Sequence, residues 1–275
     1  GETATPEALD AVRERYGLEE PVYERWWDWT TGVLRGDFGD SQLSRQPVLD
    51  LIKERLPITI QLTLMAIVMS LFLVVPLALL AAYHEGSWFD RAINTLSSTL
   101  IAIPGFVIAL VLVLTFAVWL QWLPVSAWVP LTEDPIENLK HALLPALTLG
   151  LAETAILLPV LRADAVGTLE QDYITLARAK GISSGRLLLR HALRPSSISL
   201  VTLLGLSLAR LFAGAVIVET VFGLPGVGGL LVNSVRTHDL VVVQGVVVFI
   251  ALVYLAANII VDVLYSRLDP RVSVS

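Results

Sequence analysis

Five long apolar stretches alternate with shorter polar ones along most of the chain. Each is long enough to hold about 20 apolar residues, the length at which a helix crosses a bilayer with its backbone hydrogen bonds closed inside the segment. They predict an all-α integral membrane protein, a polytopic helical bundle whose transmembrane domain occupies residues 58–265. The predicted spans run from Ile58 to Tyr83, Ile93 to Trp119, Leu139 to Leu161, Pro195 to Val218 and Leu240 to Leu264.

Basic side chains gather in loops on one side of these spans. Since short loops rich in Lys and Arg stay in the cytoplasm, we predict that the loop 162–194 and the tail 266–275 are cytoplasmic. The acidic loops around Glu133 and Glu219 then face outward, as does the segment 1–57. From an external start without an initial Met we predict a first helix upstream and six spans in the full protein. The basic residues of the long loop are Arg162, Arg178, Lys180, Arg186, Arg190 and Arg194.

The external segment is predicted to contain two short helices. The first runs from Thr5 to Tyr16, with acidic residues in its first turn, where the helix dipole favours them. The second, from Tyr23 to Leu34, carries three tryptophans and ends before the glycine-rich turn 36–39. Two interpretations stay open for the aromatic helix: a lid at the outer end of the bundle, or an anchor that only lies on the lipid headgroups.

The loop between the third and fourth spans is predicted to hold a short amphipathic helix from Gly167 to Lys180. Gly181 follows as a left-handed C-terminal cap, and Ser183 or Ser184 can cap a further helix that enters the membrane at Pro195. The apolar residues at helical spacing are Leu169, Tyr173, Leu176 and Ala177.

This loop helix is a candidate docking site for another protein. Its small residues Ala177, Ala179 and Gly181 would let a partner approach the backbone closely. A second interpretation is a basic amphipathic helix that lies on anionic lipid. The residues alone leave both interpretations open.

Ionisable residues inside the predicted spans are the next candidates, because a charge at a helix centre costs about 2.5–3.5 kcal/mol on insertion scales. Glu153 and Arg210 qualify, and so does Asp262 near the end of the last span. Glu153 and Arg210 are predicted to pair across helices as a structural clamp, with the lining of a polar cavity as the alternative. Asn94 is predicted to form an interhelical hydrogen bond, with a polar residue of the translocation pathway as the alternative.

Prolines within or near the spans predict kinks, because proline lacks the amide donor that a helix needs. Pro104, followed by Gly105, is the candidate hinge, and a fixed kink that only packs is the alternative. The other prolines of this kind are Pro76, Pro145 and Pro159.

Composition narrows the possible chemistry. The chain is 55% hydrophobic and 16% charged, with a mean hydropathy of +0.71 and no cysteine, so a disulfide, a thiolate metal site and a Cys nucleophile are excluded. It contains neither a G-x-x-x-x-G-K-[ST] phosphate loop nor an H-E-x-x-H motif. We predict no catalytic and no metal-binding residue. An ion-coupled secondary transporter is the alternative class, although such proteins show internal repeats and none is evident here.

Four short motifs occur along the chain. Residues 36–39 read G-D-F-G, residues 172–181 read D-Y-I-T-L-A-R-A-K-G, residues 190–195 read R-H-A-L-R-P, and residues 218–228 read V-E-T-V-F-G-L-P-G-V-G. Together with a C-terminal pattern they resemble the permease subunits of the dipeptide, oligopeptide and nickel ABC importer family, and the loop resembles its coupling loop. Thr-Leu-Ala replaces the Glu-Ala-Ala of the general importer pattern, which resembles this subfamily's own variant. The C-terminal residues are Asp262, Tyr265, Asp269, Pro270 and Arg271.

The resemblance implies a function and a set of partners. The chain would form part of a translocation path for short peptides, working by alternating access, with nickel or another small solute as the alternative cargo. It would hold no cofactor, because ATP and Mg²⁺ would be bound by two cytoplasmic ATPase subunits. A second homologous permease subunit, an extracytoplasmic substrate-binding protein and the lipid of a prokaryotic plasma (inner) membrane would be further partners, with no nucleic acid. The loop helix would be the coupling helix, with ATPase-coupling residues Tyr173, Ile174, Ala177, Arg178, Ala179, Lys180 and Gly181.

Overall fold

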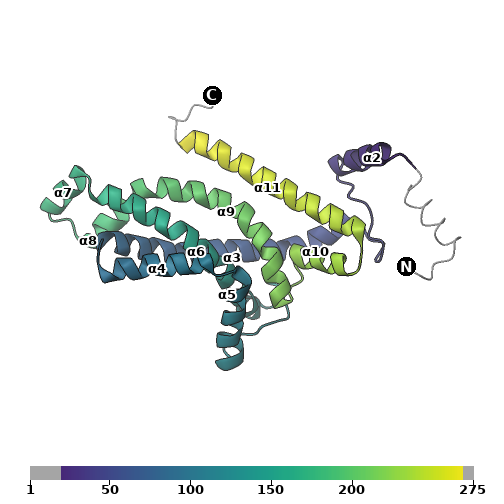
Figure 1. Ribbon diagram of the computed structural model, residues 1–275, viewed down its shortest axis with the longest axis horizontal. Helices are drawn as coiled ribbons and strands as arrows, with labels where there is room; N and C mark the ends of the chain where they lie inside the picture. Colours follow the sequence, from purple (N-terminus) through teal and green to yellow (C-terminus); the bar gives the residue numbers. More distant parts are fainter. Residues whose placement is uncertain (1–19, 269–275) are drawn as a thin grey trace.

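The computed structural model describes residues 20–268, apart from the side chains of residues 209, 262 and 264–268. Within this range the chain is helical, and its strand-like pairing is limited to an isolated bridge between Asp40 and Pro47. The predicted helix from Thr5 to Tyr16, the Asp262 side chain and most of the predicted tail lie outside the described residues. The elements in Figure 1 are α2 (Val22–Leu34), α3 (Val48–Tyr83), α4 (Trp88–Ala102), α5 (Gly105–Leu112), the π-helical η1 (Val113–Trp119), α6 (Pro135–Leu169), α7 (Asp172–Ala179), α8 (Ser184–Arg186), the π-helical η2 (Leu187–Ala192), α9 (Leu193–Phe222), α10 (Val227–Arg236) and α11 (Leu240–Leu268).

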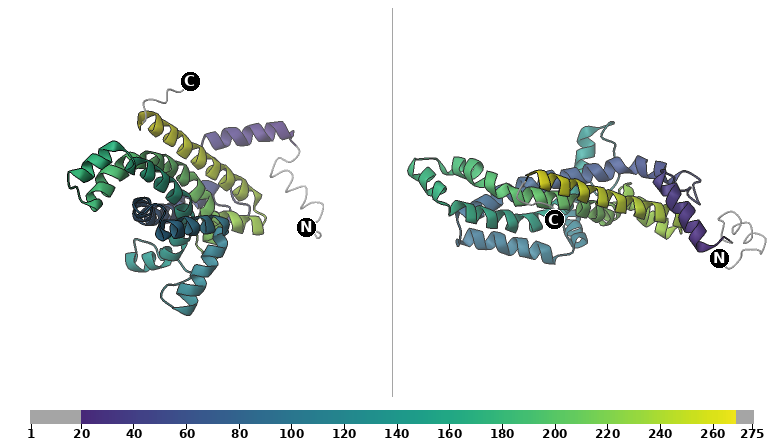
Figure 2. Two further views of the ribbon diagram at one scale, coloured as in Figure 1. Left: turned by 60° about the vertical axis from the view of Figure 1, so that its left-hand side comes forward. Right: turned by 90° about the horizontal axis from the view of Figure 1, so that it is seen from above.

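Helices α3 and α6 form the central pair of the bundle (Figures 1 and 2). They approach closely because small residues face each other: a Cβ atom added at Gly150 of α6 would lie 3.0 Å from the carbonyl oxygen of Ala66 in α3. Thr154 Oγ1 also donates a hydrogen bond to Ser70 Oγ at 3.2 Å. Small side chains and interhelical hydrogen bonds are the usual means by which helices associate in lipid.

Helix α4 packs on α6 and then breaks at Pro104. Ser97 Oγ donates to the carbonyl oxygen of Ala155 in α6 at 2.7 Å. Ile103, directly before the proline, is extended (φ −87°, ψ 124°), as steric clash with a following proline ring requires. The following segment, Gly105–Trp119, leaves at 106° to α4. The predicted span Ile93–Trp119 is therefore two helices, and its break lies at the candidate hinge.

The helix of the fourth predicted span begins well before Pro195. α8, η2 and α9 follow one another without interruption from Ser184, in agreement with the predicted start, although Ser183 makes no capping hydrogen bond through its side chain. This long helix bends by 50° between Leu208 and Arg210. Gly223 ends it in the left-handed conformation (φ 64°).

The end of the bundle opposite α7 is built from α10, the first turn of α11 and the residues before α3. Phe38 and Val48 are buried there against Val227 and Val246. Ser41 Oγ donates to Asp239 Oδ2 at 2.6 Å, next to the start of α11. The G-D-F-G turn thus serves to seat Phe38 in this small core.

Most of helix α2 projects from the bundle (Figures 1 and 2), and Val33 near its end packs on the small core around Phe38. None of its residues is buried, and Trp26 and Trp27 are 59% and 61% exposed. The predicted aromatic helix is present, while its role as a lid or as an anchor stays a prediction.

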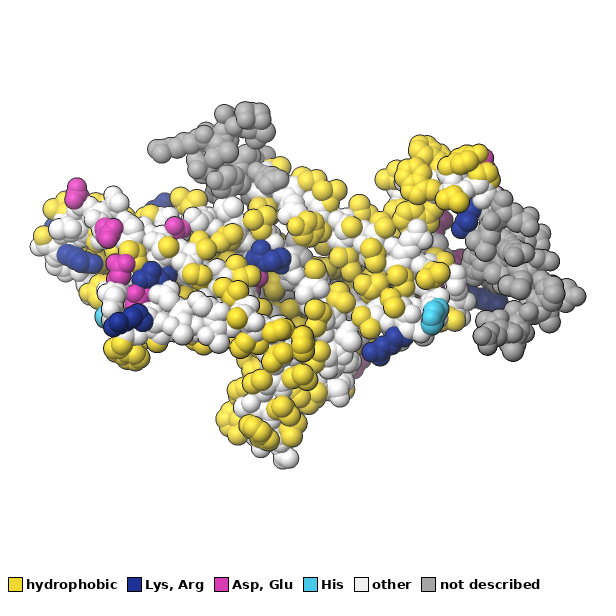
Figure 3. Space-filling model, in the orientation of Figure 1, with side chains coloured by type: hydrophobic (Ala, Val, Ile, Leu, Met, Phe, Trp, Pro, Cys, Tyr) yellow, Lys and Arg dark blue, Asp and Glu magenta, His cyan; other side chains and the backbone are white. Residues whose placement is uncertain are grey.

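Three of the described helices are long and apolar enough to cross a membrane alone, and the count is five if each of the two bent pairs is one span. All five lie where the sequence predicts spans, although α3 and α6 begin earlier, at Val48 and Pro135. Apolar side chains cover much of the face in Figure 3, and acidic side chains gather at the end that carries α7. The predicted five spans are the upper value of this count.

Gly150→Val is expected to destabilise the bundle, because the new side chain would collide with the backbone of α3. Overpacking of this kind costs about 1–3 kcal/mol, which a lower midpoint of thermal unfolding in detergent would reveal. Gly167→Val is the matched control on the same helix, since a Cβ atom there meets nothing within 4 Å. Equal shifts in the two variants would contradict a close contact at Gly150.

Candidate functional sites at the loop helix and between the helices

The end of α7 is fixed by local backbone geometry. Gly181 has φ +76° and donates its amide to the carbonyl oxygen of Arg178 at 2.9 Å, while Ile182 donates to that of Ala177 at 3.2 Å. These two bonds are the Schellman pattern, which satisfies carbonyl groups that a helix end leaves free. The predicted glycine cap is confirmed.

The predicted start of the loop helix at Gly167 is wrong. α6 continues to Leu169, and α7 begins separately at Asp172 because Gln171 is extended (ψ 147°). Asp172 then lies in the first turn, where the helix dipole favours an acid.

The packed side of α7 also differs from the predicted one. Ile174 is fully buried and Ala177 is 7% exposed, and both pack on Leu187 of η2. Tyr173 and Leu176, which the spacing places on the same apolar face, are 45% and 56% exposed. α7 therefore keeps an apolar flank that the described residues do not cover.

The predicted coupling residues fall into two groups. Ala177 and Ile174 are buried, so Ala177 does not offer the small exposed contact that was predicted from the sequence. Those that are exposed are Tyr173, Arg178, Ala179, Lys180 and Gly181.

Three contacts hold the loop to the ends of its neighbouring helices. Tyr83, the last residue of α3, forms a hydrogen bond through its hydroxyl with Ser184 Oγ at 3.0 Å. The guanidinium carbon of Arg178 lies 5.8 Å from the centre of the Tyr83 ring, within the range of a cation–π contact. Tyr173 donates its hydroxyl to the carbonyl oxygen of His191 at 3.4 Å. These contacts tie α7 and α8 to α3 and η2.

The predicted pair between Glu153 and Arg210 is present. Arg210 Nη2 donates to Glu153 Oε1 at 2.8 Å and to Ser207 Oγ at 2.8 Å, and the Ser207 hydroxyl donates to the same carboxylate. Glu153 is 3% exposed, whereas the Arg210 side chain is 42% exposed. The arrangement is that of the predicted clamp, and it joins α6 to α9 at the 50° bend.

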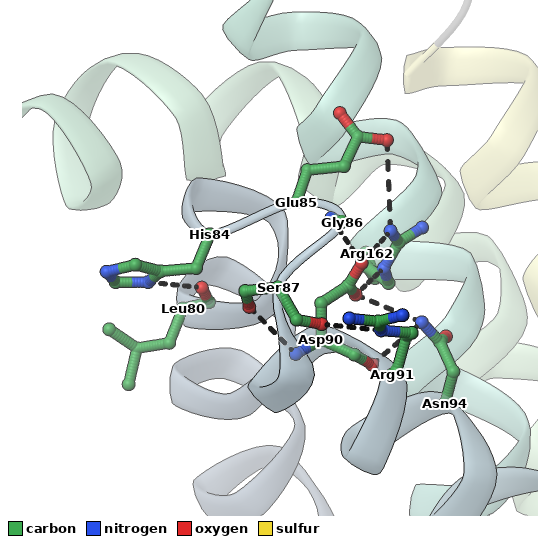
Figure 4. Close-up of polar contacts among 9 residues, drawn as sticks. All are labelled: Leu80, His84, Glu85, Gly86, Ser87, Asp90, Arg91, Asn94 and Arg162. Carbon is green, nitrogen blue, oxygen red and sulfur yellow. Dashed lines mark hydrogen bonds and ion pairs between the residues drawn. The ribbon is translucent and has the colours of Figure 1, made fainter.

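A second ion pair joins α4 to α6 (Figure 4). Arg162 donates to the Asp90 carboxylate through Nε at 2.5 Å and through Nη2 at 2.7 Å, a two-pronged geometry that makes such pairs strong. The amide of Gly86 and Nδ2 of Asn94 each donate to the same carboxylate at 3.0 Å. Asp90 is 3% exposed, and removing one partner of a buried pair costs about 3–5 kcal/mol.

The predicted interhelical bond of Asn94 is wrong. Its Nδ2 donates to the backbone oxygen and to Oδ1 of Asp90, both in α4. Residues four apart lie on one face of a helix, so Asn94 reaches the carboxylate of its own helix before it reaches α6. It supports the ion pair with Arg162 instead of crossing to another helix.

A third buried acid, Glu219 of α9, caps the start of α10. Its Oε1 accepts from Thr59 Oγ1 at 2.6 Å, and its Oε2 accepts from the amide of Gly229 at 3.0 Å. Thr59 Oγ1 in turn accepts from the amide of Val227 at 3.0 Å. Since α10 has no side-chain cap of its own, two other helices satisfy its free amides. A Cβ atom at Gly226 would overlap the Glu219 carboxylate.

The sequence indicates the Asp90–Arg162 pair and the Glu219 site only in part. Ser87 followed three residues later by Asp90 is the pattern of a helix capping box, and Ser87 does accept from the Asp90 amide. Glu219 lies inside the motif at residues 218–228. The partners Arg162 and Thr59 are 72 and 160 positions away along the chain, which no local pattern reveals.

These features define a helical membrane protein with an exposed loop helix and bent spans. Residues 74–274 match the family model described as binding-protein-dependent transport system inner membrane component, and residues 1–63 match the model for the N-terminal part of such components. The chain belongs to this family. It is a multi-pass inner-membrane permease subunit of an ABC importer, and not an enzyme.

Curated relatives match nearly the whole chain. A putative peptide transport system permease protein of Brucella abortus (strain 2308) is 36% identical over 272 residues, covering 99% of this chain and 87% of the relative. The glutathione transport system permease protein of Escherichia coli (strain K12) is 35% identical over 272 residues, covering 99% and 86%. A probable peptide ABC transporter permease protein of Sinorhizobium fredii is 35% identical, covering 99% and 87%.

A solved structure supports the fold. The crystal structure of an amino acid ABC transporter with histidines superimposes with a TM-score of 0.52 at 16% sequence identity, covering 81% of this chain and 94% of that chain. At this identity the likeness shows that the helices of this chain adopt an ABC transporter permease fold.

Thr59→Val is expected to destabilise the α10 end of the bundle, because it removes both the donor to Glu219 and the acceptor for the Val227 amide. A buried group left unsatisfied costs about 1–3 kcal/mol, measurable as a lower unfolding midpoint. Thr99→Val is the control, since the Thr99 hydroxyl is exposed and bonds only within its own helix. If Thr59→Val is as stable as the control variant, Thr59 does not hold α10.

Proposed function

We propose that this permease carries short peptides and that partner ATPases dock on α7. The observation that carries the docking proposal is the uncovered flank of Tyr173 and Leu176 on a helix whose other side packs against its own chain. Exposed basic residues, Arg178 and Lys180, lie beside this flank. Such a surface fits a groove with apolar walls and acidic edges on another protein.

A protein partner suits this flank better than a lipid surface. A helix that lies on lipid turns its main apolar face toward the acyl chains, whereas Ile174 and Ala177 turn toward Leu187. The contacts of Tyr83 with Ser184 and Arg178 hold α7 in one position. A partner would therefore meet a preorganised surface, which lowers the entropic cost of binding.

Docking on α7 would place the loop 162–194 in the cytoplasm, in agreement with its basic residues. Residues 1–57 and α10 would then lie outside, where an extracytoplasmic substrate-binding protein would deliver the cargo. The domain 58–265 would supply five spans of a six-span permease, and residues 266–275 would form a cytoplasmic tail. A second homologous permease subunit would complete the path.

ATP and Mg²⁺ would be bound by two partner ATPases, since this sequence has no phosphate loop. Their closure would move α7 and shift the permease between two arrangements, which is alternating access. Arg210 is the candidate pathway residue, because its side chain is 42% exposed beside the buried Glu153. Asn94 would act only through Asp90.

The proposed cargo rests on relatives. Those that match 99% of the chain are named for peptide or glutathione transport, and glutathione is itself a tripeptide. The binding protein would select the individual peptide.

Leu176→Arg is expected to abolish recovery of ATPase subunits when the detergent-solubilised complex is purified through this chain. The change places a charge in the apolar flank, where a partner would have to bury it without a counter-charge. Val235→Arg is the control, because Val235 is equally exposed (56%) but belongs to α10 at the other end. Full recovery of ATPase subunits with Leu176→Arg would exclude docking at this flank. Failure to recover any ATPase subunit with the unaltered chain would exclude docking altogether.

The purified complex in proteoliposomes is expected to take up a labelled dipeptide or tripeptide when ATP and the binding protein are present. Uptake should stop when ATP is omitted. Labelled Ni²⁺ and a free amino acid serve as comparison cargo. ATP-dependent uptake of Ni²⁺ without any uptake of peptides would overturn the proposed cargo and leave the importer function standing.

A further inference from the structure

The carboxylate of Asp90 connects three segments at the end of the bundle that carries α7. It accepts from Gly86 in the turn between α3 and α4, from Asn94 in α4, and from Arg162 in α6. Figure 4 shows these donors converging on it, with Glu85 on the far side of the guanidinium group at 3.8 Å. We call this set, Asp90 with Gly86, Asn94 and Arg162, the Asp90 joint.

The joint lies next to the root of the loop. Tyr83, which bonds to Ser184 and lies under Arg178 of α7, is the last residue of α3. The turn that follows donates its Gly86 amide to Asp90. A continuous series of contacts thus runs from α7 through Tyr83 and the turn to the Asp90 carboxylate.

Beyond the joint, α4 is attached to α6 along one row of buried residues. α4 buries only Asp90, Ile93 and Ser97. Ser97 bonds to the Ala155 carbonyl of α6, and Ile93 packs in a cluster with Leu157 and Leu161 of α6. Asp90 and Ser97, the first and last of these three buried residues, therefore both attach α4 to α6 through polar contacts. The first place beyond them where the chain can bend is the 106° break at Pro104.

We propose that Asp90 and Arg162 are positioning residues for transport, which couple movement of α7 to the break at Pro104. The inference rests on the proposed docking of ATPases at α7. The two-pronged guanidinium–carboxylate geometry suits this role because it fixes orientation as well as distance. A single bond would let α4 rotate against α6, and movement of α7 would be absorbed there without reaching Pro104.

The test measures ATP hydrolysed per peptide transported by the complete complex in proteoliposomes. Arg162→Lys keeps the positive charge but removes the two-pronged contact of the guanidinium group. Asp90→Asn keeps the size of the side chain but removes its negative charge. We expect both to retain the ATPase subunits on purification while the ratio of ATP to peptide rises about fivefold or more, the scale of a typical coupling between sites. The reversed pair, Asp90→Arg with Arg162→Asp, should recover part of the lost coupling.

Glu137→Gln is the matched control, since Glu137 pairs with Lys140 on the same α6 at 2.6 Å but both side chains are exposed. It should leave the ratio unchanged. A purely structural role for the joint predicts less protein and a lower unfolding midpoint with an unchanged ratio, and that result would overturn the proposal.

The two proposals fail in different ways. An unchanged ratio in Arg162→Lys and Asp90→Asn, with ATPase subunits still bound, would overturn the joint and leave docking intact. Absence of ATPase from the unaltered complex would overturn docking, and the joint would fall with it.

Discussion

The contact between α3 and α6 determines where the other helices lie. α5, α10 and α11 each contact one of the two, and α4, η2 and α9 contact both. Lipid supplies no hydrophobic force between helices, so close packing of small residues and hydrogen bonds must hold them together. Gly150 against the Ala66 carbonyl meets that demand. Both Glu153 and Arg162 belong to α6, and the positions of the two ion pairs therefore follow from this one contact.

Three buried acids of the described residues, Asp90, Glu153 and Glu219, lie where two helices join. An unpaired carboxylate in an apolar interior would be costly, and each of these three acids accepts a hydrogen bond from a residue of another helix. Asp90 fixes α4 to α6 through Arg162, Glu153 fixes α9 to α6, and Glu219 fixes the start of α10 to α3 through Thr59. The same residues that would be expensive in lipid thus specify which helices pair and in what register.

Hydrophobic length and local caps could be predicted from the sequence, because both depend on neighbours along the chain. The span positions and the glycine cap at Gly181 are of this kind. The pairing of Glu153 with Arg210 could be predicted for another reason, because the two residues form a single pair of opposite charges inside the predicted spans. The packed side of α7 could not be predicted, since helical spacing gives a period without saying which side meets Leu187. Nor could the donors of Asp90 be assigned: Arg162 is 72 positions away, and as a lone basic residue it indicated only the cytoplasmic side.

The two bends divide the bundle in a way that suits alternating access. α4 is tied to α6 on the α7 side of Pro104, and α9 is tied to α6 by Ser207 and Arg210 at its own bend. The segments beyond the bends, Gly105–Trp119 and Arg210–Phe222, turn away by 106° and 50°. In the proposed mechanism the polar bonds would resist sliding of the helices, and movement of the α7 end would concentrate at these two breaks. A signal entering at α7 would then change the angle of both outer segments together.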